Sequence, residues 1–220
     1  MAKYKFDTHV HTSETSPCGY LSGAEIATRY HRLGFDGIVI TDHLGDYSIR
    51  RMPGNHIWEN CVDGFLKGYR AAKTAGERLG LKVILGAEFR FKRSMSDYLV
   101  YGFDRDFLLV NPFLYKQTLE EFYEKYKDEL LIIQAHPYRD GSIDATPDLI
   151  HGVEVENCNK DHNNYNHKAR RLAKAHPHLH KFKGSDTHAP GGEGLTHMLL
   201  DTLPEDSFQF VEAIVAGAYE

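Results

Sequence analysis

The sequence has few cysteines and no long apolar run, and each absence excludes a class of protein. Its three cysteines, Cys18, Cys61 and Cys158, are an odd and sparse set that does not suit a disulfide framework and indicates a reducing compartment. No run approaches the roughly 18 apolar residues that a membrane helix requires. Residues 1–6 lead into a strand-like segment without the apolar region of a signal peptide. We therefore expect a cytoplasmic protein with no membrane partner.

Basic residues are also fewer than acidic ones. Lys and Arg number 26 against 31 Asp and Glu, which gives a net charge of -5 and a pI near 6.3. Because proteins that bind nucleic acids usually present a strongly basic face, this balance disfavours a nucleic acid partner, although it permits a local basic pocket for a small anion. A length of 220 residues with 41% hydrophobic residues suits one compact domain that covers residues 1–220.

Short apolar runs alternate with helical patterns along the chain. We expect strands at residues 4–9, 37–41, 81–88, 97–102, 130–135, 152–156 and 181–185. Between them lie helices that begin after Ser22 and after Thr118 or span residues 57–79, 165–175 and 208–216, and Gly34 ends the first. This alternation predicts an α/β fold with a parallel sheet and right-handed crossovers. About seven strands in one domain indicate a closed or distorted barrel, with an open doubly wound sheet as the alternative.

Histidine is abundant, with fourteen residues, and imidazole is the commonest transition-metal ligand. The first expected strand carries Asp7, His9 and His11 on one face, because alternate strand residues point the same way. Its two imidazoles could converge on one metal, and Asp7 could orient one of them. A His-x-His pair alone is weak evidence in so histidine-rich a chain, and residues 176–180 hold two more, which suit a helix end or solvent.

Other expected strands also end in histidine or carboxylate residues. These are Asp42, His43, Glu88, His136, Asp186 and His188. In parallel α/β folds the carboxyl ends of strands lie at one edge, where functional sites are found. A ring of imidazoles and carboxylates would be destabilised by repulsion and desolvation unless divalent cations neutralised it. The pattern therefore predicts a metal site.

Five motifs together resemble those of the PHP (polymerase and histidinol phosphatase) superfamily. They occur in the same order at residues 7–11 (DTHVH), 40–43 (ITDH), 86–88 (GAE), 135–137 (AHP) and 184–188 (GSDTH), and so extend over nearly the whole chain. The resemblance implies a distorted (β/α)7 barrel and a site of two or three divalent metal ions that hydrolyses phosphoesters. Zinc, manganese and iron all accept such imidazole–carboxylate sites.

By motif position, the resemblance also implies which residues hold each metal. His9, His11, Glu88 and Asp186 would hold one ion, and Glu88 would bridge to a second ion that also takes His136. A third ion would be held by His43 and His188.

The chain departs from the family pattern at two places. The family often has Asp or His shortly after the second motif histidine, and residues 12–19 (TSETSPCG) contain neither. Glu14 or Cys18 could substitute, and we favour Glu14 because hard oxygen ligands suit the rest of the site. Some members supply another His from the segment at residues 97–104, where this chain has none, so Asp104 or water is the candidate there.

Asp42 and Arg139 are the candidate catalytic residues, for assisting the leaving group and positioning the phosphate. Arg50, Arg51, Arg90 and Lys92 follow other strand ends, and Glu154, Glu156 and Asn157 are expected to support the ligands. The predicted function is hydrolysis of a small phosphomonoester, such as a histidinol-phosphate-like compound or a nucleotide or sugar phosphate, by metal-activated hydroxide. The alternatives are a phosphodiesterase or nuclease acting on oligonucleotides, which needs a basic aromatic groove, and a non-catalytic PHP regulatory module.

Overall fold

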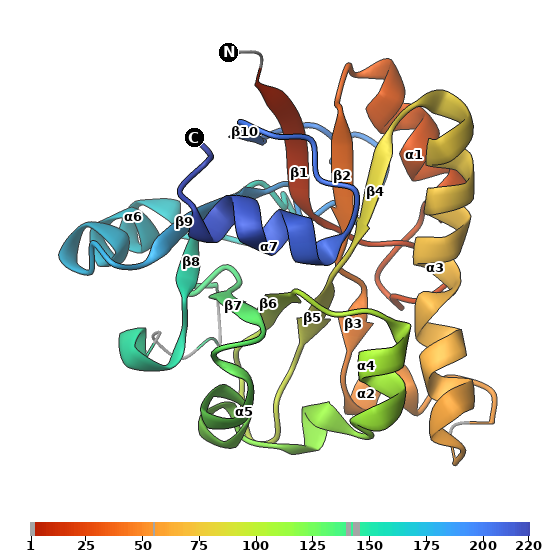
Figure 1. The fold of residues 1–220 in the computed structure, drawn as a ribbon, viewed down its shortest axis with the longest axis horizontal. Helices are drawn as coiled ribbons and strands as arrows, with labels where there is room; N and C mark the ends of the chain where they lie inside the picture. The colour runs from red at the N-terminus through yellow and green to blue at the C-terminus, as the bar shows by residue number, and fades with distance from the viewer. Residues whose placement is uncertain (1–2, 55, 140–141, 143–145) are drawn as a thin grey trace.

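In the computed structural model, which describes residues 3–54, 56–139, 142 and 146–220, the chain forms a mixed α/β fold with two sheets (Figure 1). The first sheet has the order β10-β1-β2-β4, with β10 (Met198–Leu200), β1 (Tyr4–Val10), β2 (Gly37–Ile40) and β4 (Lys82–Leu85). The second has the order β3-β5-β6-β7-β8-β9, with β3 (His43–Leu44), β5 (Ala87–Phe89), β6 (Tyr98–Tyr101), β7 (Leu131–Gln134), β8 (Gly152–Asn157) and β9 (His180–Gly184).

The two sheets are joined by short segments of chain. Strand β2 runs on to β3, and β4 runs on to β5 through Gly86. At the other end, an isolated parallel bridge pairs Val10, at the end of β1, with Thr187 just after β9. The hydrogen bonds thus define two linked sheets, and the closed seven-stranded barrel and the single domain stay predictions.

The expectation of parallel strands is correct for most pairs and wrong for β6, and the structure adds β10, which is not among the expected strands. The parallel pairs are β1–β2, β2–β4, β3–β5, β7–β8 and β8–β9. Strand β6 is antiparallel to both β5 and β7, and β10 is antiparallel to β1. Only residues 90–97 connect β5 to β6, which is too short for the crossover that a parallel pair requires.

Helices cover both sides of the strands. They are α1 (Gly23–Arg32), α2 (Asp46–Ile49), α3 (Trp58–Leu79), α4 (Arg105–Val110), α5 (Leu119–Tyr126), α6 (Asn166–Ala175) and α7 (Ser207–Val215). The two predicted helix starts are confirmed, because Ser22 with Glu25 and Thr118 with Glu121 form capping boxes. Among the described residues, none of the helices is both long and apolar enough to cross a membrane.

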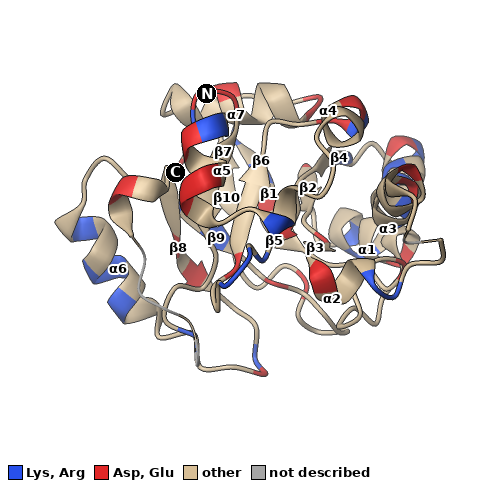
Figure 2. Ribbon diagram, turned by 90° about the horizontal axis from the view of Figure 1, so that it is seen from below, with Lys and Arg blue, Asp and Glu red and all other residues tan. Residues whose placement is uncertain are grey.

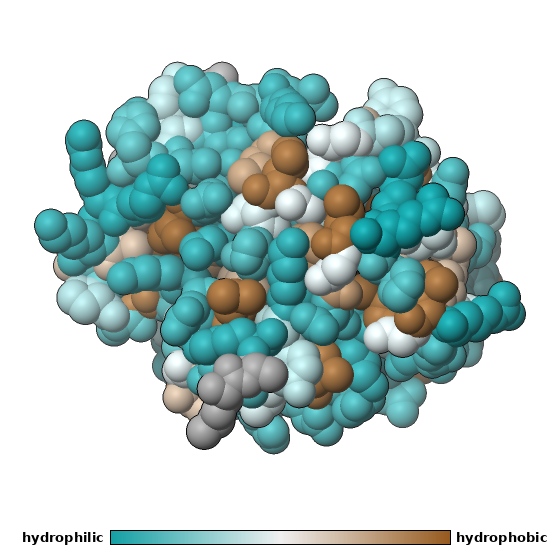
Figure 3. Space-filling view, turned by 90° about the horizontal axis from the view of Figure 1, so that it is seen from above, coloured by the Kyte–Doolittle hydropathy of each residue, from teal (hydrophilic) through white to brown (hydrophobic). Residues whose placement is uncertain are grey.

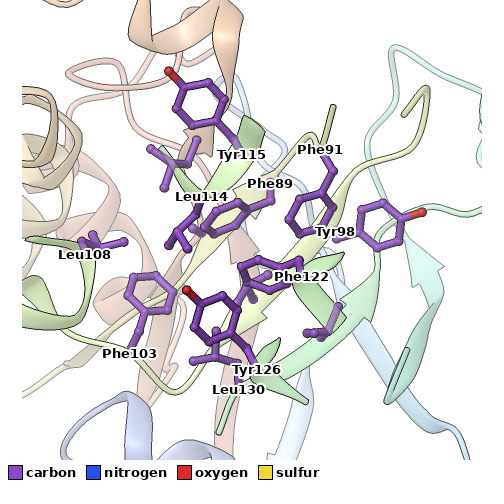
Figure 4. Packing of buried hydrophobic residues seen from close by; sticks show 14 of the residues in the cluster. Phe89, Phe91, Tyr98, Phe103, Leu108, Leu114, Tyr115, Phe122, Tyr126 and Leu130 are labelled. Atoms are coloured by element: carbon purple, nitrogen blue, oxygen red, sulfur yellow. The ribbon is translucent and has the colours of Figure 1, made fainter. Parts of the chain in front are cut away.

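Among the described residues, the largest buried cluster is rich in aromatic side chains and includes Phe89 from β5, the strand that also carries Glu88 (Figure 4). The ring centroids of Phe91 and Phe122 are 4.7 Å apart, and those of Phe89 and Phe122 are 5.6 Å apart. Side chains alternate along a strand, so Phe89 enters this cluster while Glu88 faces the opposite side. Aromatic contacts of this kind contribute about 0.5–1.5 kcal/mol each beyond burial. The cluster therefore holds β5 in place.

The surface has a different character from this core. The face of the molecule in Figure 3 is mostly hydrophilic, with small separate hydrophobic patches.

Helix α3 approaches the first two strands closely because it has a glycine at position 68. A Cβ atom there would lie 1.7 Å from Thr12 Oγ1 and 2.8 Å from Asp42 Oδ2. The helix α1 packs just as closely, since a Cβ on Gly23 would lie 2.4 Å from the Gly68 carbonyl oxygen. These contacts place α3 directly against the segments that follow β1 and β2.

Replacing this glycine should therefore destabilise the protein. Alanine is favoured over glycine in a helix by about 1 kcal/mol, but in Gly68→Ala the clash with Thr12 and Asp42 should outweigh that gain and lower the free energy of unfolding by about 1–3 kcal/mol. Gly64→Ala is the control, because its Cβ would meet only the flexible end of Met52 at 3.1 Å. Urea denaturation of both variants in the presence of chelator measures the difference. A Gly68→Ala protein as stable as Gly64→Ala would contradict this packing.

Candidate metal centre

The ends of three strands bring four buried ligand side chains together. His9 lies near the end of β1, His11 follows that strand directly, Glu88 lies on β5, and Asp186 follows β9. The His11 Nε2 atom is 3.3 Å from Glu88 Oε2 and 3.2 Å from Asp186 Oδ1. The corresponding distances from His9 Nε2 are 3.6 Å and 3.5 Å. The structure thus places the four residues expected at the first metal around one point.

The imidazole rings of His9 and His11 face each other through their Nε2 atoms. No hydrogen bond can form between these two atoms while both rings are neutral. His9 Nδ1 lies 3.0 Å from Glu154 Oε1, a carboxylate that can only accept, so this nitrogen carries the proton. Ser16 Oγ donates to Asp42 Oδ1 at 2.6 Å and therefore accepts from His11 Nδ1 at 3.1 Å. While both rings are neutral, their Nε2 atoms present lone pairs to each other at 3.1 Å. A proton on one ring or a cation between the rings relieves this repulsion, and the arrangement fits a divalent metal ion.

Other buried polar atoms of the site support the same fit. Among the described residues, Asp186 Oδ1, His188 Nε2 and His136 Nδ1 are buried without a hydrogen-bond partner. The His188 Nε2 and Asp186 Oδ1 atoms are nevertheless 3.1 Å apart. Buried polar atoms are almost always paired in folded proteins, so each exception needs an explanation. A metal ion shared by Asp186 Oδ1 and His188 Nε2 would satisfy both of these atoms.

The carboxylates of the site attract positive charge strongly. Burial raises the pKa of Glu88, but the neighbouring His43 and His9 outweigh burial and hold that pKa well below its usual value. Burial acts the same way on Asp186, and His9 leads the groups that keep the pKa of Asp186 well below its usual value. Conversely, burial lowers the pKa of His9, whereas Asp186 and Glu154 raise it well above its usual value. The carboxylates therefore stay negatively charged, and without a metal ion the positive charge beside them would come from protonated histidine.

Glu88 lies between the first group and a second one. Its Oε1 atom is 2.9 Å from His136 Nε2, while its Oε2 atom is 3.0 Å from His43 Nδ1. Glu88, Asp97 and His136 have ligand atoms within 4.8 Å of one another. This is the geometry expected of a carboxylate that bridges two ions.

Asp97, and not Asp104, is the carboxylate that joins the second group. The prediction of Asp104 is wrong because its Oδ1 atom accepts the Phe107 N–H at 2.8 Å and caps α4. Asp97 is held by Arg90, whose Nε and Nη2 atoms donate to its two oxygens at 2.7 and 2.6 Å.

The third group contains Cys18 in place of the expected Glu14. His11, Cys18, His43 and His188 have ligand atoms within 4.8 Å of one another. The Glu14 carboxylate instead accepts the Gly23 N–H at the start of α1, at 3.0 and 3.1 Å, and its side chain is exposed. Burial raises the pKa of the Cys18 thiol, but hydrogen bonds with His188 and His43 outweigh burial and lower it to about 5. The structure thus favours Cys18, as a thiolate, over Glu14.

Asp42 does not face the three groups. Its Oδ1 atom accepts from Thr12 N at 2.7 Å and from Ser16 Oγ, and its Oδ2 atom accepts from Thr12 Oγ1 at 2.6 Å. These bonds direct the buried carboxylate into the loop after β1, so the geometry corrects its expected catalytic role to one of positioning His11 through Ser16.

Arg139 lies beside Asp186 rather than at an open position. Its Nη2 atom donates to Asp186 Oδ2 and, at 3.1 Å, to Asn157 Oδ1, while its Nε atom donates to Asn164 Oδ1 at 2.9 Å. The guanidinium therefore neutralises one Asp186 oxygen and leaves the other facing the histidines. A phosphate contact would have to share this guanidinium with Asp186.

Several supporting residues hold the ligands in place. Glu154 accepts from His9 Nδ1 and, through Oε2, from His136 N at 2.8 Å, in the supporting role that the sequence suggested. Asp7 was expected to orient an imidazole, but its Oδ1 atom binds the backbone N–H groups of His9 and Ser185. Ser16 was missed, because only the folded loop shows that its hydroxyl links Asp42 to His11.

A cavity of about 730 Å³ opens beside the second and third groups. Its lining includes Cys18, His43, Glu88 and Asp97 from those groups and the four cations Arg90, Lys92, Arg93 and Lys116. Most of these cations come from residues 90–97, the short connection between β5 and β6. The antiparallel hairpin that sequence analysis did not anticipate therefore places positive charge at the mouth of the metal centre.

The fold is similar to several solved structures. A two-domain protein from Bacteroides vulgatus, which contains a predicted PHP-like metal-dependent phosphoesterase, superposes with a TM-score of 0.70 at 18% identity. The match covers 99% of this chain but only 64% of that protein. PsfC from Pseudomonas syringae has a TM-score of 0.64 at 16% identity, with 95% of this chain and 87% of that one covered. An amidohydrolase from Chromobacterium violaceum with bound sulfate has a TM-score of 0.58 at 18% identity, with 98% and 97% covered.

The family follows from the sequence itself. No curated protein matches the chain, and at the identities above the structural likeness shows the fold alone. The model of the PHP domain, however, matches residues 7–182, which contain four of the five motifs and most of the metal centre. On this match over most of its length, the chain belongs to the PHP domain family.

Proposed function

We propose that the chain is a metal-dependent phosphoesterase that hydrolyses a small phosphomonoester. The observation that carries the proposal is the pair of facing Nε2 atoms of His9 and His11, with Glu88 and Asp186 beside them. Membership of the PHP family and the likeness to the Bacteroides vulgatus protein support a phosphoester as the substrate.

The neighbouring cavity supports a small anionic substrate. Its volume of about 730 Å³ lies in the range of small-molecule sites, roughly 300–1,000 Å³. Arg90, Lys92, Arg93 and Lys116 line it, and such cations bind phosphate oxygens through charge-assisted hydrogen bonds. A histidinol-phosphate-like compound, a nucleotide or a sugar phosphate would fit this description.

The residues of the chain divide the work of the reaction. When bound, the divalent ions neutralise the phosphoryl group and lower the pKa of the attacking water. Glu154 and Ser16 hold the rings of His9 and His11 with Nε2 directed inward. Arg139 holds one oxygen of Asp186 and Arg90 holds both oxygens of Asp97, so these carboxylates stay fixed during turnover.

An oligonucleotide substrate is the less favoured alternative. Basic residues do gather on α6, as Figure 2 shows, and they include Lys168, Arg170, Arg171 and Lys174. Among the described residues, however, none from α6 lines the cavity beside the metal centre. A volume of about 730 Å³ suits a small metabolite better than an extended strand.

Metal content tests the basis of the proposal. Protein purified without chelator should contain at least about two transition-metal equivalents per chain by elemental analysis, because Glu88 has ligands on both of its oxygens. Adding manganese or zinc to the chelated protein should raise its Tm, since an ion that binds only the folded state stabilises it. Metal-free protein with no rise in Tm would refute the metal centre.

Glu88→Gln tests the bridging carboxylate. The amide keeps the size of the side chain but removes the charge that two cations would share. Activity should therefore fall at least about 100-fold, because removing a residue that only hydrogen-bonds to a metal ligand already costs about 10–100-fold. Glu156→Gln is the matched control, because Glu156 accepts from Thr196 and lies outside the three groups. Equal activity of the two variants, with both folded by circular dichroism, would rule out bridging.

Substitutions of the cavity lysines test the substrate assignment. Lys92→Met and Lys116→Met should each raise KM for a phosphomonoester about 10-fold while leaving metal content unchanged, since each loses one charge-assisted contact. Lys174→Met on α6 is the control and should behave like the wild type. A panel that includes phosphodiesters and oligonucleotides distinguishes the alternatives. A larger effect of Lys174→Met on oligonucleotide cleavage would favour the nuclease.

A further inference from the structure

We infer that Cys18 is a sulfur ligand of a metal site that it forms with His43 and His188, and that this site takes thiophilic ions in preference to manganese or magnesium. The inference rests on the proposed metal centre but is independent of the substrate. It makes the centre chemically mixed, with imidazole and carboxylate groups in one part and a thiolate in another.

The distances suit one shared ion. The ligand atoms of Cys18, His43 and His188 all lie within 4.8 Å of one another. Zinc lies about 2.0 Å from an imidazole nitrogen and about 2.3 Å from a thiolate sulfur, so small side-chain rotations bring all three onto one ion. His188 Nδ1 lies 3.2 Å from Asn159 Nδ2, and the buried Nε2 atom lies 3.1 Å from Asp186 Oδ1, so Nε2 is the nitrogen left to bind an ion.

Backbone contacts hold the three ligand segments against one another. Tyr20 N donates to the His188 carbonyl oxygen at 2.7 Å, which ties the Cys18 loop to the segment after β9. His43 N donates to Ser16 Oγ at 3.0 Å, which ties the start of β3 to the same loop. Gly19 packs so tightly that a Cβ there would lie 2.6 Å from the Thr12 carbonyl carbon. These contacts fix the position of the loop that carries Cys18.

The other two cysteines have different surroundings. Cys61 is buried on α3 in the aromatic cluster, and Cys158 follows β8. Within the described part of the chain, neither belongs to a group of metal-binding side chains. Cys158 has intermediate exposure, as Cys18 has, so it is the control for the metal measurements. Burial raises the pKa of the Cys158 thiol to about 11, so we expect it to alkylate slowly whether or not zinc is present.

The identity of the ligand decides which ions the site prefers. Carboxylate oxygens are hard ligands that suit manganese and magnesium, whereas a thiolate is soft and selects ions such as zinc, cobalt and cadmium. The carboxylate that could have filled this place, Glu14, is instead bound to the start of α1. The third group should therefore discriminate against manganese, while the groups around Glu88 accept it.

Cobalt substitution tests the sulfur ligand directly. Titrating cobalt(II) into the chelated full chain should produce a near-ultraviolet sulfur-to-cobalt charge-transfer band. Cys18→Ser should abolish this band and lose about one cobalt per chain, whereas Cys158→Ser should retain both. Cys18→Asp should regain the ion without the band and shift its preference toward manganese, which shows that the loop still folds.

Alkylation gives an independent readout of the same site. Iodoacetamide should modify Cys18 in the chelated protein, and zinc should slow this at least about 10-fold because a bound thiolate is a poorer nucleophile. Cys158 should react at the same rate with and without zinc. Bound cobalt without the band, or a band that survives in Cys18→Ser, would overturn the inference alone. Failure to bind any cobalt would overturn the metal centre as well.

Discussion

The metal centre depends on an electrostatic repulsion between two imidazole rings that the fold holds close together. Two imidazole nitrogens, His9 Nε2 and His11 Nε2, face each other at 3.1 Å, and both carry lone pairs while the rings are neutral. Glu154 fixes the first ring and the Ser16–Asp42 pair fixes the second, so neither ring can turn away without leaving a buried carboxylate or hydroxyl unpaired. The energy of this arrangement falls only when positive charge enters between the rings. The same requirement explains why Glu88 and Asp186 are buried here.

The rest of the fold supplies the rigidity that the repulsion requires. Aromatic packing behind Phe89 holds the strand that carries Glu88, and Gly68 lets α3 contact Thr12 and Asp42 directly. Interior packing of this density resists small displacements, so the ligands cannot drift apart to relieve their charges. The loops carry the other part of the function. Residues 90–97 bring Arg90, Lys92 and Arg93 to the cavity, on a connection that packs less tightly than the strands it joins.

The sequence predicts the features that depend on local pattern and leaves out those that depend on the fold. The strand ends, the caps at Ser22 and Thr118, and the gathering of histidines follow from periodicity and short motifs. The antiparallel direction of β6 does not, because pairing is decided by the length of one hairpin connection. The sequence offered both Glu14 and Cys18 for the third group, but it could not decide between them, since the choice depends on which way one loop folds back. Asp42 was a candidate catalytic residue, but both of its oxygens accept hydrogen bonds from Thr12, so it supports the loop instead. No local sequence pattern could show this.

The position of Glu88 couples the three groups to one another. One of its oxygens faces His136, and the other lies 3.0 Å from His43 Nδ1 and 3.3 Å from His11 Nε2. An ion in any group would withdraw electron density from this carboxylate and would fix its rotamer for the others. Charge repulsion between ions opposes filling, whereas the shared orientation assists it, and the repulsion is smaller where a thiolate has already reduced the charge of its ion. Cys18 thereby affects not only which ion the third group takes but also how readily the neighbouring groups fill, because both effects pass through the same carboxylate.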